Sequence, residues 1–200
     1  MLFSANFLSN HGTFFLYVIP IAVIFCETGL FFGMIFPGDT LLFYLGMMAS
    51  LGKVDVWFIS ISLLVASILG YQFAYWQGAY IARWSDKRPD GFFITQERVQ
   101  KAARFFKKYG VFSILLAKNI AIVRVFIPYI AGMVAVPKLS YFIFNVLGSL
   151  IWVPVFVLLG YFFGATNPDI VELVVPWIVG VILLFILWTL MQYVRYRLKK

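Results

Sequence analysis

Long apolar stretches without charged residues dominate the chain and predict helices that cross a membrane. Residues 56–82, 139–168 and 173–194 carry no charged side chain over 27, 30 and 22 positions, respectively. A helix of roughly 20 apolar residues is long enough to cross about 30 Å of hydrocarbon. We therefore predict three transmembrane helices, at residues 56–82, 139–164 and 173–194.

The first apolar region, residues 14–51, is interrupted, and it predicts a helical hairpin that enters the bilayer and returns. Pro37-Gly38 breaks the apolar run, and only 13 residues, Thr40 to Gly52, remain before the next charge. A helix of that length reaches about 20 Å and is too short to cross alone. We expect Pro37 and Gly38 to shape this hairpin.

A second interrupted region, residues 110–137, has the same character. Its last 13 residues, Val125 to Pro137, again make a short arm, and we expect Pro128 and Gly132 to shape it. Irregular backbone persists at membrane depth only where protein or a wet cavity satisfies its polar groups. We therefore expect two opposed re-entrant hairpins. The predicted fold is all-α and integral to the membrane, a single polytopic domain over residues 1–200 with about three transmembrane helices and a basic amphipathic surface helix.

Weak internal similarity indicates that the two hairpins belong to a repeat. Gly46-Met47-Met48-Ala49 ends the first short arm, and Gly132-Met133-Val134-Ala135 ends the second. Leu-Gly-Tyr then occurs at residues 69–71 and again at residues 159–161. Transporters are often built from such repeats, with broken helices that meet near the midplane. Short apolar motifs also recur by chance, so both interpretations stay open.

The composition agrees with a membrane protein and excludes other classes. Apolar residues make up 63% of the chain and charged residues 12%, whereas soluble domains contain about 45–50% and about 25%. This excludes a soluble enzyme, a disordered chain and a disulfide-stapled module, and the single Cys26 cannot form an internal disulfide. The net charge of +8 follows from a basic membrane-facing loop rather than from nucleic-acid binding.

That loop, residues 83–109, contains the one long polar stretch. Residues 96–109 fit a basic amphipathic helix that lies on the membrane surface, with Thr95 as its N-cap and Gly110 as its end. A solvated loop would have the same composition, and this alternative stays open. The positive-inside rule places the loop and the basic tail at 195–200 in the cytoplasm. The side on which the N-terminus lies stays open.

Four ionisable residues fall inside apolar sequence, where each costs about 2.5–3.5 kcal/mol and is a functional candidate. They are Glu27, Asp39, Lys118 and Arg124. Each also has a structural interpretation: Asp39 as a helix N-cap, Lys118 as a side chain that snorkels to the interface, and Glu27 as half of an ion pair. Two acids in one hairpin and two bases in the other predict pairing across the hairpins.

The chemistry of these residues points to an anion and to protons. Lys118 and Arg124 are suited to a phosphate group, since arginine offers a fork of donors and lysine a compact charge. Carboxylates shielded from water can exchange protons near neutral pH, so Glu27 and Asp39 are candidates for proton coupling. Enzyme chemistry finds no support: we expect no catalytic residues, no metal and no cofactor, because no ligand spacing or nucleophile motif is present.

Several short motifs that combine glycine or proline with charged residues lie in order along the chain. They are Glu27-Thr28-Gly29, Phe36-Pro37-Gly38-Asp39-Thr40-Leu41-Leu42, Val123-Arg124-Val125-Phe126-Ile127-Pro128-Tyr129-Ile130-Ala131-Gly132, Asn145-Val146-Leu147-Gly148 and Leu159-Gly160-Tyr161-Phe162-Phe163-Gly164. Together they resemble the signatures of the DedA family of membrane proteins, from about Phe14 to Gly164.

The resemblance implies two re-entrant hairpins with flanking spans and a function in moving lipid headgroups across the bilayer. Bacterial members are linked to recycling of undecaprenyl phosphate and to the proton-motive force, and eukaryotic relatives act as scramblases. By position, the family's acids fall on Glu27 and Asp39 and its arginines on Lys118 and Arg124. The chain departs from the family pattern at Lys118 (usually arginine), Ala121-Ile122 (usually Pro-Gly), Val125 (usually threonine) and Tyr71 (usually an acid).

From these observations we predict a multi-pass protein of the cell inner (plasma) membrane that moves an anionic lipid, above all undecaprenyl phosphate, by alternating access. Its partners are then a polyprenyl phosphate or phospholipid and protons, with no nucleic acid; the oligomeric state stays open. The alternatives are a proton or small-ion antiporter, a phospholipid scramblase, and a membrane scaffold that transports nothing.

Overall fold

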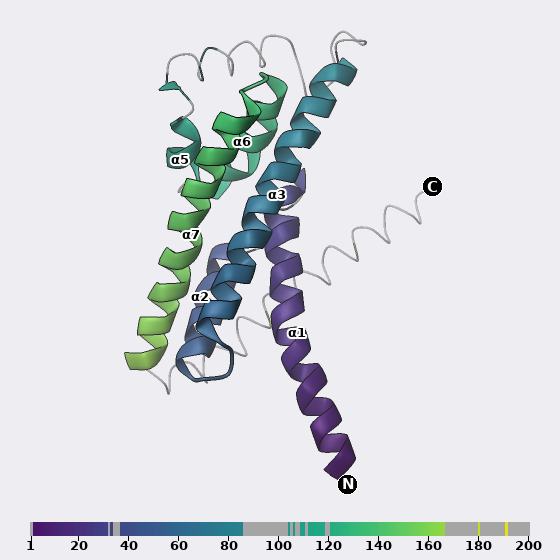
Figure 1. Ribbon diagram of the computed structural model, residues 1–200, viewed down its shortest axis with the longest axis vertical. Coiled ribbons are helices and arrows are strands. Elements are labelled where there is room, and N and C mark those ends of the chain that lie inside the picture. Colours follow the sequence, from purple (N-terminus) through teal and green to yellow (C-terminus); the bar gives the residue numbers. More distant parts are fainter. Residues whose placement is uncertain are drawn as a thin grey trace. The chain divides into compact units, whose positions relative to one another are not determined.

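A computed structural model describes residues 2–31, 33, 37–85, 104, 106, 109–110, 112–118, 121–166, 180 and 191. The part of the chain that it describes is helical and contains no strand. The helices are α1 (Leu2–Gly29), α2 (Gly38–Ser50), α3 (Val56–Ser85), α5 (Ser113–Ala117), α6 (Ala121–Met133) and α7 (Lys138–Thr166), shown in Figure 1. Most of the predicted third span at 173–194, the tail at 195–200 and most of the surface helix at 96–109 lie outside the described residues.

Two of these helices are long and apolar enough to cross a membrane, at Val56–Arg83 and Lys138–Thr166. They confirm the helices predicted at 56–82 and 139–164. Large apolar side chains recur about once per turn along the outer face of α3, as the 3.6-residue period requires. The exposed members of this stripe are Trp57, Ile61, Val65, Leu69, Phe73, Trp76 and Tyr80.

The predicted short arms at 40–52 and 125–137 overlap the helices α2 and α6, each of 13 residues, which begin two and four residues earlier than predicted. Pro37 is the N-cap of α2, which begins at Gly38. Helix α6 begins at Ala121 and continues through Pro128. At about 1.5 Å per residue, neither helix spans about 30 Å of hydrocarbon.

Both short helices end in the same hydrogen-bonded turn. After α2, the N–H groups of residues 51, 52 and 53 donate to the carbonyls of residues 47, 49 and 48, in that order. After α6, the N–H groups of residues 134, 135 and 136 donate to the carbonyls of residues 130, 132 and 131, in the same pattern. One residue of each turn is left-handed, with φ of +69° at Gly52 and +54° at Ala135. This is a Schellman-type cap, in which glycine fits and alanine is strained.

The chain divides into two compact units, one made of residues 1–35 with 57–155 and the other of residues 36–56 with 156–200. In the first unit α3 packs against α1, where Gly29 lies against Gly70, and the Gln77 side chain donates to the Gly29 carbonyl at 2.6 Å. An apolar core in the same unit joins residues from α3, α5, α6 and the start of α7. Its members are Tyr75, Phe106, Ile114, Ile127, Ala131, Val136 and Tyr141.

Each short helix crosses a long helix at a pair of glycines. In the first unit Gly132 of α6 lies against the Tyr75 carbonyl of α3, and Gly78 lies against the Tyr129 carbonyl. In the second unit Gly46 of α2 lies against the Val157 carbonyl of α7, and Gly160 against the Phe43 carbonyl. The backbones approach so closely that no Cβ fits at any of the four glycines, a packing typical of membrane helices.

This shared packing supports the internal repeat. Gly78 and Gly160 each lie 22 positions after the first residue of their helix, Val56 or Lys138. The structural counterpart of Gly160 is therefore Gly78, not Gly70 as the Leu-Gly-Tyr match predicts. Each short arm packs on the long helix that follows the other hairpin.

Candidate functional site

The first feature of the site is an ion pair between Glu27, near the end of α1, and Arg124 in α6. The Arg124 Nη2 and Glu27 Oε1 atoms are 2.9 Å apart, and the two residues are only 6% and 2% exposed. The guanidinium also lies over the Trp152 ring, with Cζ 4.5 Å from the ring centroid. The predicted pairing across the hairpins is thus confirmed for these two residues.

The backbone around Glu27 is tightly folded. Helix α1 ends two residues later, and the Gly33 N–H donates to the Leu30 carbonyl at 2.8 Å. A Cβ at Gly33 would collide with the Glu27 carbonyl, so this turn requires glycine. Within the last turn of α1, Thr28 donates from Oγ1 to the Ile24 carbonyl at 2.8 Å. Glu27 is therefore held by a closely packed helix end and turn.

Lys118, directly after α5, is also buried, at 3% exposure. Its Nζ donates to the Asn145 carbonyl and Oδ1, both at 2.7 Å, and to the Ser149 Oγ at 2.6 Å. It also lies 4.0 Å from the centroid of the Tyr71 ring. All three donors of the ammonium group are therefore directed at neutral oxygens of the protein. In this conformation a phosphate would have to displace one of them.

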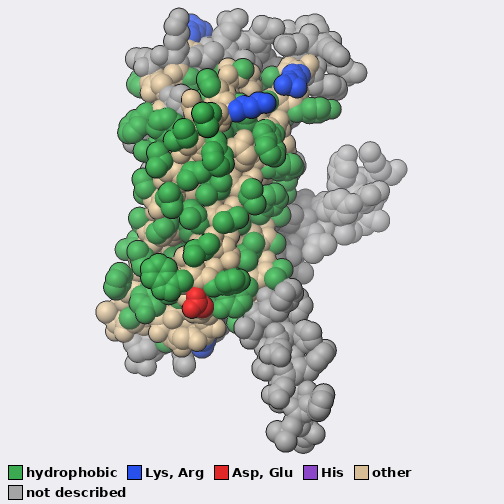
Figure 2. Space-filling view, viewed as in Figure 1, with side chains coloured by type: hydrophobic (Ala, Val, Ile, Leu, Met, Phe, Trp, Pro, Cys, Tyr) green, Lys and Arg blue, Asp and Glu red, His purple; other side chains and the backbone are tan. Residues whose placement is uncertain are grey.

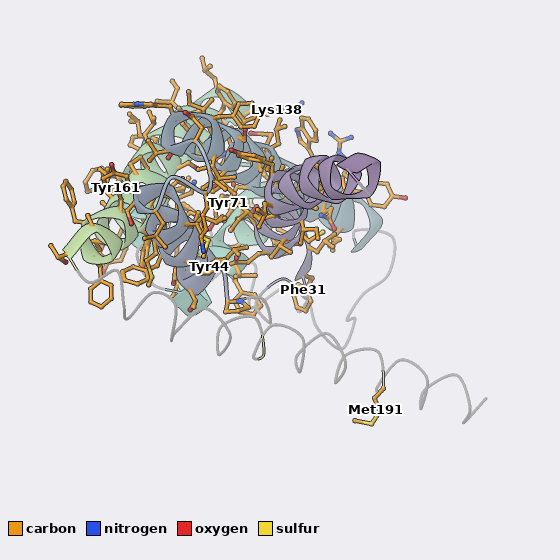
Figure 3. All side chains as sticks on the ribbon, turned by 90° about the horizontal axis from the view of Figure 1, so that it is seen from below. Phe31, Tyr44, Tyr71, Lys138, Tyr161 and Met191 are labelled. Atoms are coloured by element: carbon orange, nitrogen blue, oxygen red, sulfur yellow. The ribbon has the colours of Figure 1, made fainter. Side chains whose placement is uncertain are left out.

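The two cations are neighbours. Lys118 lies over Tyr71 and Arg124 lies over Trp152, and the two rings contact each other edge to face with centroids 6.5 Å apart. Figure 3 shows Tyr71 inside the group of helices, where it is buried. The site therefore holds two positive charges, each against one ring of a contacting aromatic pair, and Glu27 is paired with Arg124.

Asp39 lies in the second unit, as the second residue of α2. The interpretation of Asp39 as the helix N-cap is wrong, because the N-cap is Pro37 and Asp39 is the second residue of the helix. Asp39 instead stands in the first turn, where a carboxylate interacts favourably with the positive end of the helix dipole. Its role in proton coupling stays a prediction.

The predicted hairpin-shaping residues have distinct positions. Pro37 and Gly38 mark the start of α2, and Gly132 provides the close crossing of α6 with α3. Pro128 lies within α6 rather than at its end. Tyr129, its neighbour, donates from its hydroxyl to the Gly29 carbonyl at 3.0 Å and so ties α6 to the end of α1.

The departures from the family pattern fall close to this site. Lys118 and Tyr71 are in direct contact, so an ammonium and a ring stand where the pattern has an arginine and an acid. Ala121 and Ile122 are the first two residues of α6. Val125, which follows Arg124 in the sequence, is buried.

Sequence reasoning did not place Asn145, Ser149, Ser67 and Trp152 in the site. Asn145 and Ser149 contact Lys118, Ser67 is hydrogen-bonded to Ser149, and Trp152 lies against Arg124. Three of them are polar residues in otherwise apolar spans, and such residues need hydrogen-bond partners inside the bundle. That signal is present in the sequence, since Asn145 and Ser149 lie four residues apart on one face of α7. Among the described residues, no three His, Cys, Asp or Glu gather as metal ligands.

Apolar side chains on the outer face and buried polar groups inside define the class of protein. The exposed stripe of α3 is apolar, and Figure 2 shows hydrophobic side chains over most of the described surface in view. Glu27, Lys118, Arg124 and Asn145 are buried instead. A water-soluble protein has the opposite distribution of charge, so this is an α-helical membrane protein with a buried charged site.

Comparison with known proteins gives the family. The VTT domain family matches residues 36–162. The chain is 33% identical to Protein DedA of Escherichia coli K12 over 195 residues, covering 96% of this chain and 88% of that protein. It is 30% identical to Inner membrane protein YqjA of the same organism over 151 residues, covering 76% and 69%. An uncharacterized membrane protein of Mycobacterium leprae is 35% identical over 144 residues, covering 72% and 64%.

The chain therefore belongs to the DedA family of VTT-domain membrane proteins. No solved structure matches it.

Proposed function

We propose that this protein moves an anionic lipid across the membrane and that Arg124 binds the headgroup phosphate. The supporting observation is the buried Arg124–Glu27 pair, in which the N–O distance is 2.9 Å. A lone guanidinium is costly in this environment, so it needs an anionic partner at every stage. Glu27 is that partner when no lipid is bound. The family resemblance makes undecaprenyl phosphate the first substrate to test.

The pair suggests how protons and lipid are coupled. While Glu27 is ionised it occupies Arg124 and competes with phosphate for the guanidinium. A proton on Glu27 removes its charge and weakens this contact, and the phosphate, which accepts a bidentate fork, then takes its place. Release of the lipid restores the ion pair as Glu27 loses its proton. Exchange of partners at one arginine thus links one proton to one headgroup.

The short helices support a re-entrant arrangement. Helices α2 and α6 have 13 residues each, so neither is long enough to cross the hydrocarbon alone. We propose that they enter the bilayer and turn back, which brings Arg124 to membrane depth. In this topology the protein lies in the inner membrane, and residues 83–108 and the C-terminus face the cytoplasm.

Lys118 and Asp39 have secondary parts in this proposal. The Lys118 ammonium contributes positive potential beside Arg124, through the two rings that separate them. Asp39, at the positive end of α2, is a second candidate carrier of the coupling proton. Both roles are tested separately from that of Arg124.

The test uses vesicles that contain purified protein and a trace of polyprenyl phosphate in both leaflets. A membrane-impermeant phosphatase outside the vesicles removes phosphate only from lipid in the outer leaflet. In protein-free vesicles hydrolysis stops when the outer leaflet is exhausted, and with active protein it continues into the inner pool. We expect continued hydrolysis with the unaltered chain, loss with Arg124→Gln, and no loss with Arg83→Gln, which removes an exposed charge at the end of α3.

The alternatives give different results in the same vesicles. An antiporter gives proton or cation flux without lipid movement, and a scramblase moves neutral and anionic phospholipid equally and without a proton gradient. A scaffold gives neither flux nor lipid movement. Full activity of folded Arg124→Gln would refute the assigned headgroup contact.

A further inference from the structure

The groups that surround the Lys118 ammonium are suited to bind a cation. The three oxygens around Nζ lie at 2.7, 2.7 and 2.6 Å, and the Tyr71 ring closes the pocket at 4.0 Å from its centroid. All of these groups are neutral. Three converging acceptors and an aromatic face are the partners that a compact cation selects.

The pocket is held in shape by contacts that do not involve Lys118. Asn145 donates from Nδ2 to the Ile68 carbonyl at 3.0 Å, and this fixes its amide with Oδ1 toward the ammonium. The Ser149 and Ser67 hydroxyls are hydrogen-bonded at 3.1 Å. Tyr141 donates from its hydroxyl to the Tyr71 carbonyl at 2.9 Å. Helices α3 and α7 therefore pre-organise the acceptors.

Gly148 leaves space for the aliphatic part of the Lys118 side chain. A Cβ at this position would lie 2.5 Å from Lys118 Cδ, a distance that atoms do not tolerate. Asn145, Gly148 and Ser149 stand at positions i, i+3 and i+4 and so share one face of α7. On this face Gly148 lies against the apolar part of the Lys118 side chain, and Asn145 and Ser149 contact its charged end.

We propose that Asn145, Ser149 and the Tyr71 ring form a binding site for a primary ammonium group, which Lys118 occupies as a tethered ligand. The number of acceptors matches the three N–H donors of an ammonium, whereas a planar guanidinium has five donors in a fork that needs coplanar partners. This inference goes beyond the proposed function and does not depend on it.

The test is chemical rescue of stability in detergent, without lipid substrate. Lys118→Ala removes the stem and head and leaves space for n-propylammonium. We expect propylammonium chloride to raise the melting temperature of this variant once its concentration exceeds the dissociation constant, by about 3–5 °C for each further tenfold increase in concentration. The unaltered chain, whose site is filled, and the double variant Lys118→Ala with Asn145→Leu should show no such rise. Choline chloride at equal concentration controls for ionic strength and is too bulky to bind.

The absence of any rise in folded Lys118→Ala, or an equal rise with choline, would overturn the proposal. If Lys118→Ala does not fold, the melting temperature of Lys118→Arg tests the proposal instead. It keeps the charge but has the wrong donor geometry, so we expect it to melt well below the unaltered chain. An unchanged melting temperature for Lys118→Arg would show that the pocket does not select an ammonium. Because each readout is thermal stability, failure here leaves the lipid-transport test unaffected.

Discussion

The substitution Glu27→Gln probes the buried ion pair most directly. It preserves the shape of the side chain but removes the charge that lies 2.9 Å from Arg124 Nη2. The guanidinium stays buried at 6% exposure and loses its anionic partner. The expected result is a folded but clearly less stable protein.

The structure sets the size of this effect. Breaking a buried pair by removing one partner typically costs about 3–5 kcal/mol. The Trp152 ring still contacts Arg124 at 4.5 Å, and a desolvated cation–π contact retains about 2 kcal/mol, so we expect the lower end of that range. For a chain of this length, about 3 kcal/mol corresponds to a melting temperature lowered by roughly 6–12 °C.

Thermal melting of the purified protein in detergent measures the loss, and a double-mutant cycle assigns it. Arg124→Gln should be destabilised too, since Glu27 is then buried without its cation. The double variant with both amides leaves no charge buried and should melt close to the unaltered chain. Arg83→Gln is the matched control for Arg124→Gln, because Arg83 is exposed and its change should stay within about 0.5 kcal/mol.

Additive losses in the cycle would refute this reasoning. If the double variant loses as much stability as the two single variants together, then Glu27 and Arg124 do not neutralise each other. A Glu27→Gln protein that melts with the unaltered chain would have the same meaning. In either case the exchange of partners at Arg124 loses its physical basis.

Three further outcomes test the packing and the second acid. Ala135→Gly should stabilise the protein by about 1 kcal/mol, since alanine is strained at its left-handed φ of +54°, and Gly52→Ala should lose a similar amount at +69°; thermal melting checks both. Gly46→Ala and Gly132→Ala should each cost about 1–3 kcal/mol, because a Cβ at either position overlaps a backbone carbonyl of the crossing helix, and melting checks these as well. Asp39→Asn should cost no more than about 0.3–1 kcal/mol of stability, because Asp39 lies in the first turn of α2 but is not its cap. If Asp39 carries a coupling proton, the same substitution should weaken transport driven by a pH gradient in the phosphatase assay.

The elements of the fold follow closely from the sequence. Uncharged runs predict α3 and α7, and the two 13-residue arms predict α2 and α6, because length and apolar content alone decide whether a helix can cross. The sequence predicts a helix end at Gly110, and its φ of +67° agrees. The helix crossings do not follow in detail: Gly78 rather than Gly70 matches Gly160, since only the packed structure reveals which face of α3 meets α6.

The site is predictable in part, for a physical reason. Buried opposite charges must pair, so the sequence predicts pairing across the hairpins, but only the structure shows that Glu27 is the acid that pairs with Arg124. For Lys118 the sequence predicts a phosphate contact or a snorkelling side chain, and Lys118 instead contacts Asn145 and Ser149. Those partners are neutral residues in an apolar run, and their orientation depends on packing between helices that the run itself does not specify.

The coupling of protons to lipid through Glu27 is the central claim, and one rate comparison tests it most directly. The measurement is the initial rate at which inner-leaflet polyprenyl phosphate becomes accessible to the external phosphatase, with and without an imposed proton gradient, at a temperature where both proteins are folded. We predict that the gradient accelerates the unaltered chain and leaves Glu27→Gln unchanged, because its amide cannot take up or release a proton. A Glu27→Gln protein that still responds fully to the gradient would contradict the account.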